Sequence, residues 1–419
     1  MRLAFAALAL AFSASTSATA TTYHVVLDES TPLRATISLN LPSRHRGELA
    51  LAIRPSALRS LIGVPTCDNL PLGVRTSTAW TVPASCERVQ WTLGLRDQDR
   101  DGMDAADPSG AWSAGGRWWL LTDRLAFLAP PGGWQDADVE ISGRLHDGTV
   151  VKVRRPFPRR GQMPFYGVLS ATPPRLYRSP NFTLRVHGRV PEGADGKQQQ
   201  LFADTWSRWR RDILPRDAAA PSALDMLWVN PPPAAEPNFM ASAGMRAVLM
   251  QSISGPDRVA SDAKLRAAII MSAHEGFHTL IGSIPQTWPT WANESWASYF
   301  AWRAAQGHLD PAALKVASDL IDAPASPSLL TIEAQIAQGD GSNYEAFYGK
   351  GARFWAAIDA VLVSRRNPSG RLAALIQDTH GLRGLNWSNA DAIAAYLDAR
   401  SAGRASAVVR CYLVERDCG

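Results

Sequence analysis

Residues 261–300 decide the fold and read SDAKLRAAIIMSAHEGFHTLIGSIPQTWPTWANESWASYF. At the centre stands His274-Glu275-Gly276-Phe277-His278, and Glu294 follows after the fifteen residues 279–293. Small and apolar residues recur before and through this centre at three-to-four spacing, with Ser261 as a good N-cap and Gly282 as a stop. The sequence therefore predicts that the two histidines lie well inside a helix.

The spacing of the histidines indicates a metal site. Four residues along a helix advance the chain by about 6 Å and turn it by roughly 400°, so His274 and His278 project from one face. Zinc accepts nitrogen and carboxylate ligands in a tetrahedron, and a catalytic site leaves one position open for water. A second predicted helix, from Thr290 to Gly307, can bring Glu294 to the same metal. The alternative is two ordinary surface or core histidines on a helix.

Two segments carry a resemblance to a known clan. Residues 274–278 followed by residues 291–300, WANESWASYF, resemble the signature of gluzincin zinc metallopeptidases of the aminopeptidase N-like and glycyl aminopeptidase-like kind. Residues 347–352, FYGKGA, resemble the Tyr-Glu-Lys-Gly-Ala segment of those enzymes. The resemblance implies that Glu294 completes the zinc ligands and that Tyr348 donates a hydrogen bond to the oxyanion, a role for which Tyr344 is the alternative.

The sequence also departs from the pattern of that clan. Ser295 stands where a glycine is usual, and fewer residues separate His278 from Glu294 than in aminopeptidase N-like enzymes. The Gly-x-Met-Glu-Asn strand, whose glutamate holds a free amino group in those enzymes, has no clear counterpart. The nearest segment, residues 243–246, reads AGMR and has no carboxylate. Cleavage at an amino terminus and cleavage inside a peptide therefore both stay open.

These observations predict a zinc-dependent peptidase with one zinc ion per chain, held by His274, His278 and Glu294. Glu275 would activate a metal-bound water for attack on a peptide bond, and Tyr348 would stabilise the oxyanion. One alternative is a catalytically inactive secreted binding protein on a peptidase scaffold. Another is a zinc hydrolase with a non-peptide substrate. The sequence leaves the oligomeric state open.

The chain of 419 residues is long enough for two or three domains. Short alternating runs over residues 23–27, 35–39, 89–93 and 139–141 are typical of strands. The chain after residue 261 is mostly helical in pattern, and further helices are expected at about 198–213, 311–321, 343–365, 372–378 and 390–399. We expect a multidomain α+β fold with a signal peptide (1–20), an N-terminal β-sandwich-like domain (21–160), a thermolysin-like zinc peptidase domain (161–308) and a helical C-terminal region (309–419). Residues 154–163 are expected to form the hinge after the first domain.

The N-terminus indicates export. Arg2, a short apolar run and small residues ending at Ala20 are typical of a cleaved signal, so the mature protein is expected in the periplasm or outside the cell. No later segment is long and apolar enough to predict stable membrane insertion. In an oxidising compartment the four cysteines are expected to form two local disulfides, Cys67–Cys86 and Cys411–Cys418.

Charged segments give two further expectations. Asp97, Asp99 and Asp101 alternate before Gly102 and resemble the first half of a calcium loop, although a solvated acidic turn is the simpler interpretation. The net charge of +5 is modest, and the arginines of residues 154–160 stand in a Pro-containing stretch. This pattern predicts a solvated linker and no nucleic-acid partner.

Overall fold

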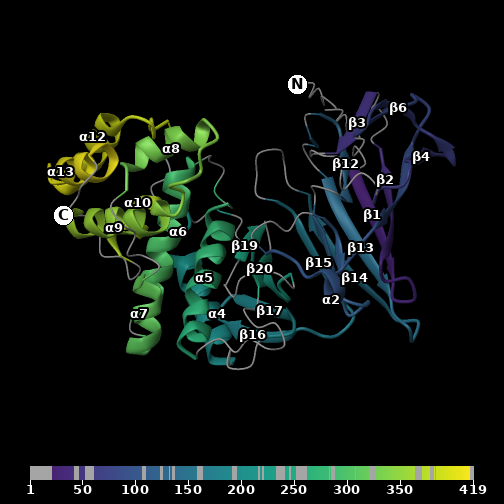
Figure 1. The fold of residues 1–419 in the computed structure, drawn as a ribbon, viewed down its shortest axis with the longest axis horizontal. Helices are drawn as coiled ribbons and strands as arrows, with labels where there is room; N and C mark the ends of the chain where they lie inside the picture. Colours follow the sequence, from purple (N-terminus) through teal and green to yellow (C-terminus); the bar gives the residue numbers. More distant parts are fainter. Residues whose placement is uncertain are drawn as a thin grey trace, which may run out of the picture.

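The computed structural model describes residues 21–415 except for gaps at 42–46, 52–60, 106–109, 123–125, 132, 135–136, 158–163, 191–195, 216–217, 219–220, 233–240, 245–246, 252–261, 283, 285–287, 307, 320–325, 364–369, 378–381 and 383. The expected signal peptide, Ser261 and Cys418 lie outside the described residues. Figure 1 shows strands on one side of the molecule, helices on the other, and a further sheet with helices α4 and α5 between them.

Three sheets make up the N-terminal part. The largest has the order β14 (Val150–Pro156), β13 (Ala137–Arg144), β1 (Thr21–Asp28), β2 (Arg34–Asn40), β8 (Arg88–Gly94), β4 (Thr66–Cys67) and β5 (Leu70–Pro71). The second has the order β12 (Leu128–Ala129), β3 (Gly47–Leu51), β7 (Ala79–Val82) and β6 (Gly73–Thr76), and the third β15 (Tyr166–Ser170), β11 (Trp118–Thr122), β10 (Trp112–Ser113) and β9 (Arg96–Asp97). The predicted strands in this part are confirmed within β1, β2, β8 and β13.

Alternation of side chains explains this part of the fold. In β1 the side chains of Tyr23, Val25 and Leu27 are fully buried, while their neighbours are more exposed. Successive residues of a strand point to opposite faces, so the alternating sequence gives the sheet one apolar face over the core. Cys67 and Cys86 form the expected disulfide at the edge of this core, with their Cα atoms 5.9 Å apart. The predicted Cys411–Cys418 pair involves a residue outside those described.

A fourth sheet stands between the strands and the helices. Its order is β16 (Arg175–Ser179), β17 (Phe182–Gly188), β18 (Ala223–Val229), β20 (Ala247–Gln251) and β19 (Ala241–Gly244), with β17, β18 and β20 parallel and both edge strands antiparallel. Leu184, Met226 and Met250 belong to a core cluster shared with the helices. Leu227 and Val229, on the opposite face, join a smaller cluster with Trp118 and other residues of the β15-β11-β10-β9 sheet. The central strand β18 is therefore buried on both faces of the sheet.

Helices follow this sheet to the end of the described chain: α5 (Asp262–Ile281), α6 (Thr290–Ala305), α7 (Pro311–Asp319), α8 (Leu329–Ala337), α9 (Ala346–Val361), α10 (Arg371–Gln377), α12 (Ala390–Ser401), α13 (Ala405–Val409) and a π-helical turn at Arg410–Val414. The predictions of α5, α6, α7, α9, α10 and α12 are confirmed, as is that of α4 (Gly196–Asp212), which precedes them. The sequence reasoning missed α8 and α13. No helix within the described ranges is long and apolar enough to cross a membrane.

Two glycines let the central helices approach closely. A Cβ atom at Gly276 of α5 would stand 2.8 Å from the ring of Phe202 on α4. A Cβ atom at Gly351 of α9 would collide with the side chain of Ser295 on α6. Glycine inside a helix costs about 1 kcal/mol relative to alanine, and close contact between helices explains why this cost is tolerated at both positions. The α4–α5 and α6–α9 contacts hold the two central helices from opposite sides.

Arginines from two parts of the chain surround one buried carboxylate, that of Asp225 on β18. Arg185 donates to both of its oxygens at 2.7 and 2.8 Å, His187 lies at 2.9 Å, and Arg155 of β14 donates at 3.2 Å. Burial raises the pKa of Asp225, but hydrogen bonds from His187 and Arg185 lower it more, so the net pKa lies well below its ordinary value. The expectation of a solvated linker is wrong for Arg154 and Arg155, because both lie in β14.

Replacing Asp225 tests how much its buried ion pairs with Arg185 and Arg155 contribute to stability. Asp225→Asn removes the charge that balances two arginines in a site where the carboxylate is only 6% exposed. We expect the free energy of unfolding at pH 7 to fall by about 3–5 kcal/mol. Because folding lowers the pKa of Asp225, this stabilisation is present above the unfolded pKa and is lost as the pH falls through the folded pKa. Urea unfolding of the two proteins measures the difference.

The neighbouring ion pair provides a matched control. Arg154 pairs with Asp138 at 2.6 Å, but the side chains are 62% and 31% exposed. Asp138→Asn should therefore change the free energy of unfolding by less than about 1 kcal/mol. An equally small effect of Asp225→Asn would contradict a stabilising role for the buried cluster.

Candidate metal centre

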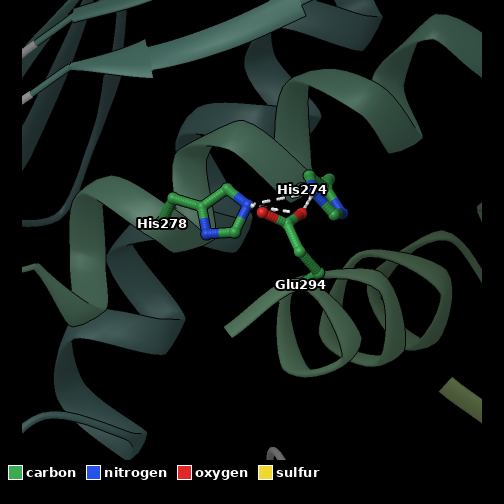
Figure 2. A group of neighbouring side chains, drawn as sticks. All are labelled: His274, His278 and Glu294. Atoms are coloured by element: carbon green, nitrogen blue, oxygen red, sulfur yellow. Dashed lines mark hydrogen bonds and ion pairs between the residues drawn. The ribbon is translucent and has the colours of Figure 1, made fainter. Parts of the chain in front are cut away.

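The two central helices bring three side chains to one point. His274 and His278 project from consecutive turns of α5, and Glu294 projects toward them from the first turns of α6, as Figure 2 shows. Nε2 of His274 lies 3.0 Å from Nε2 of His278. Oε2 of Glu294 lies 3.2 Å from the first nitrogen and 3.3 Å from the second. The three side chains are only 9–14% exposed.

This triangle matches the donor arrangement of one zinc ion. Zinc binds nitrogen and carboxylate oxygen at about 2.0–2.2 Å, and two ligands of a tetrahedron at that radius are about 3.3–3.6 Å apart. The observed separations of 3.0–3.3 Å are close to this edge length. Three protein donors also leave the fourth tetrahedral position open. The predicted ligands are therefore placed where they could hold one metal ion.

The other ring nitrogen of each histidine has its own partner. Nδ1 of His274 lies 3.2 Å from Oγ of Ser298, and Nδ1 of His278 lies 3.3 Å from Oδ1 of Asn293. The amide oxygen of Asn293 can only accept, so Nδ1 of His278 donates, and its Nε2 faces the donor atoms of His274 and Glu294. Such partners fix the orientation of the rings and leave Nε2 free for a metal. Both partners come from α6, the helix that also carries Glu294.

Charge also favours this arrangement. Burial raises the pKa of Glu294, but the adjacent His278 and His274 lower it more, and the net pKa lies well below its ordinary value. Burial lowers the pKa of His278, whereas the carboxylates of Glu294 and Glu275 raise it, with a net increase. The His278 imidazole beside these carboxylates thus holds a proton more tightly than a free imidazole does. A divalent cation can take the place of that proton.

Glu275 lies on α5 next to His274, as the sequence predicts. Burial raises the pKa of its carboxyl group, and the nearby imidazoles of His274 and His278 offset part of that increase. Glu275 therefore lies close enough to the three candidate ligands for their charges to act on its carboxyl group. Desolvation of this kind brings a carboxylate toward the pKa range of a general base.

Two tyrosines reach the same region from α9 and the turn before it. The hydroxyl of Tyr344 donates to Oε1 of Glu294 at 3.0 Å, while the ring of Tyr348 packs edge-on against His274 with centroids 5.4 Å apart. Burial and the charge of Glu294 raise the pKa of both phenols, so both remain protonated donors at neutral pH. Tyr344 is engaged with a ligand, which leaves Tyr348 as the candidate for an oxyanion donor.

The whole fold resembles solved zinc peptidases. An aminopeptidase N family protein from Idiomarina loihiensis matches with a TM-score of 0.66 and 12% identity, over 95% of this chain and 76% of that one. An M1 zinc metallopeptidase from Deinococcus radiodurans matches with a TM-score of 0.51 and 13% identity, over 95% and 94% of the two chains. A variant of it bound to a Tyr-Ser-Ala substrate gives a TM-score of 0.52 at 13% identity, over the same shares.

This chain has the aminopeptidase N-like gluzincin fold. The match extends over nearly all of the chain, which confirms both the fold expected from the two sequence segments and the multidomain α+β class. At 12–13% identity the likeness concerns the fold and leaves the chemistry to the residues themselves. Neither a protein-family model nor a curated protein sequence matches the chain.

The acidic turn at residues 97–101, away from the candidate metal centre, gives no support to calcium. Asp97 caps the short helix α2 (Gln98–Asp101) by accepting from the backbone N–H of Asp99 at 3.0 Å. Asp99 pairs with Arg117 at 2.7 Å, and Asp101 pairs with Arg100 at 2.8 Å. Across the described ranges, the His274, His278 and Glu294 group is the one set of three or more metal-type ligands that lie close enough to share an ion.

The sequence did not predict the contacts of three residues at the candidate metal centre. Ser298 lies one helical turn after Glu294, and this i,i+4 spacing on a helix that faces the metal was the available signal. Asn293 was quoted as part of the motif without a partner. Tyr344 was considered only as a substitute for Tyr348, because its contact with Glu294 spans 50 residues of sequence.

Proposed function

We propose that this chain is an exported zinc-dependent peptidase in which His274, His278 and Glu294 hold the metal. The observation that carries the proposal is the triangle of Nε2, Nε2 and Oε2 atoms, 3.0–3.3 Å apart, with Glu275 next to His274 on the same helix. Bound zinc would polarise the scissile carbonyl and lower the pKa of a water molecule. The remaining chemistry belongs to side chains of the protein.

Glu275 would act as the general base and then as the general acid. Its position next to His274, one residue along the helix, keeps it off the metal and near the open coordination position. It accepts a proton from the attacking water and delivers it to the leaving nitrogen. A scaffold used only for binding has no chemical need for a carboxylate at this point, which favours an enzyme over an inactive binding protein.

Tyr348 would stabilise the charge that develops on the carbonyl oxygen. Its phenol stays protonated, and its ring is held against His274 at the edge of the site. A donor oriented before the reaction stabilises the transition state without a cost of reorganisation. Tyr344 would hold the second oxygen of Glu294 instead, so the two tyrosines would have separate tasks.

Peptides are the substrate class that the fold and the site favour. The edge strand β19 packs against α5, and Oγ1 of Thr279 on α5 donates to the carbonyl of Gly244 on that strand at 3.1 Å. An extended peptide can add to an exposed sheet edge through backbone hydrogen bonds. The M1 zinc metallopeptidase variant from Deinococcus radiodurans, which has a similar fold, is bound to a Tyr-Ser-Ala substrate. Peptides with free and with blocked amino termini would distinguish terminal from internal cleavage.

The proposal includes the domain division and the cellular location. The proposed units are a strand-rich unit over residues 21–160, a zinc-binding unit over 161–308 and a helical region over 309–419, and the last two share one core cluster. The third region would complete the site through Tyr348. A disulfide between Cys67 and Cys86 is typical of exported proteins, as is the signal-like sequence of residues 1–20.

Substitutions can distinguish the proposed general base, Glu275, from a proposed zinc ligand, Glu294. Glu275→Gln should keep about one zinc per chain and lose nearly all peptidase activity, because it removes the proton acceptor and no metal bond. Glu294→Ala should lose zinc as well as activity, because it removes one of three ligands. Elemental analysis after dialysis and a peptide-library assay give the two readouts. The reverse pattern, with zinc lost in Glu275→Gln and kept in Glu294→Ala, would show that the roles are assigned wrongly.

Substitutions of Tyr344 and Tyr348 distinguish the roles proposed for the two tyrosines. Tyr348→Phe should lower kcat about a hundredfold with little change in KM, because its donor acts mainly in the transition state. Tyr344→Phe should weaken zinc binding about tenfold, because it removes a hydrogen bond to a ligand. Steady-state kinetics at saturating zinc and titration with a chelator separate the effects. Full activity of Tyr348→Phe beside an inactive Tyr344→Phe would place the oxyanion donor one turn earlier.

A further inference from the structure

The helix that carries Glu294 has no N-cap of its own. The cap position of α6 is Pro289, whose side chain makes no capping hydrogen bond. The first N–H groups of any helix lack partners within the helix, and a helix end without partners frays. Asn293 and Glu294 are the fourth and fifth residues of α6, so this first turn controls where both side chains point.

A glutamate from another helix supplies the missing acceptors. Oε1 of Glu333 on α8 accepts from the backbone N–H of Thr290 at 3.1 Å, and Oε2 accepts from that of Trp291 at 2.9 Å. Both hydrogen bonds are partly buried. One carboxylate thus satisfies two adjacent donors, and its charge lies at the positive end of the α6 dipole.

Helix α8 is anchored so that this carboxylate has a defined position. Ser328 caps α8 by accepting from the N–H of Thr331 at 3.2 Å. Lys350 of α9 donates to the carbonyls of Ser326 and Pro327, just before that cap, at 2.9 and 3.0 Å. Leu329 and Ile332 are fully buried on the inner face of α8. The short helix is therefore held between α6 and α9.

We propose that Glu333 is a positioning residue for the metal centre. This inference rests on the proposed function. By capping α6 from outside, it fixes the first turn and hence the direction of Asn293 toward His278 and of Glu294 toward both imidazoles. Each residue of a helix turns the chain by about 100°, so a frayed first turn moves both side chains away from their partners. Among the described residues, the hydrogen bonds of Glu333 go to backbone N–H groups of α6 and not to a metal ligand.

Zinc affinity tests this inference without an activity assay. Apo forms of the wild type, Glu333→Ala and Glu333→Gln are titrated with Zn²⁺ in competition with a chelating dye, and the Co²⁺ absorption spectrum reports the ligand geometry. We expect Glu333→Ala to bind zinc at least about tenfold more weakly, with an altered Co²⁺ spectrum. Glu333→Gln, which keeps the shape of the side chain and one carbonyl acceptor, should show a smaller loss.

A control variant removes a cap elsewhere. Asn389 caps α12 by accepting from the N–H of Ala392 at 2.9 Å, and α12 provides no residue of the metal centre. Asn389→Ala should therefore leave zinc affinity and the Co²⁺ spectrum unchanged. Unchanged zinc affinity in Glu333→Ala would overturn the positioning role.

A second-site variant separates capping from general packing. Pro289 has the extended backbone of an N-cap residue, with φ −64° and ψ 155°, so Pro289→Ser places a capping hydroxyl on α6 itself. In the Glu333→Ala background this substitution should recover most of the lost zinc affinity. No recovery would mean that Glu333 acts in some way other than capping, which contradicts the proposal. Failure of the wild type to bind zinc would instead overturn the proposed function, and this inference with it.

Discussion

The close contact between α5 and α6 holds two imidazoles and one carboxylate with their donor atoms 3.0–3.3 Å apart. Such a group is costly to bury unless its charges balance. Glu294 faces His274 and His278, and each of the three side chains has a second partner that fixes its orientation. The elements around the two helices serve to keep this arrangement in place.

Neighbouring elements hold α5 and α6 in place from three directions. On one side α4 approaches α5 over Gly276, and on the other α9 approaches α6 over Gly351, where an added methyl group would collide with the facing helix. The carboxylate of Glu333 caps the N-terminus of α6. The sheet beneath α4 and α5 is joined to the N-terminal strands by an apolar cluster and by the buried Asp225 group. A metal centre with fixed ligands requires rigid elements of this kind.

Local patterns predicted the parts of the site that depend on one helix at a time. The pairing of His274 with His278 follows from helical periodicity, and the start of α6 after Pro289 follows from the aromatic and small residues of residues 291–300. Contacts between residues far apart in the sequence leave no local sequence pattern. Arg155 reaches Asp225 across 70 residues, so a composition-based expectation of a solvated linker was wrong. Helix α8 was missed because a nine-residue helix depends on tertiary packing for its stability.

Anomalous diffraction from crystals of the zinc-loaded protein, collected on both sides of the zinc absorption edge, tests the central claim most directly. The account predicts one strong peak per chain, about 2.0–2.2 Å from Nε2 of His274, Nε2 of His278 and a carboxylate oxygen of Glu294. A zinc-loaded crystal without a peak between these three residues, or with its only strong peak elsewhere on the chain, would contradict it.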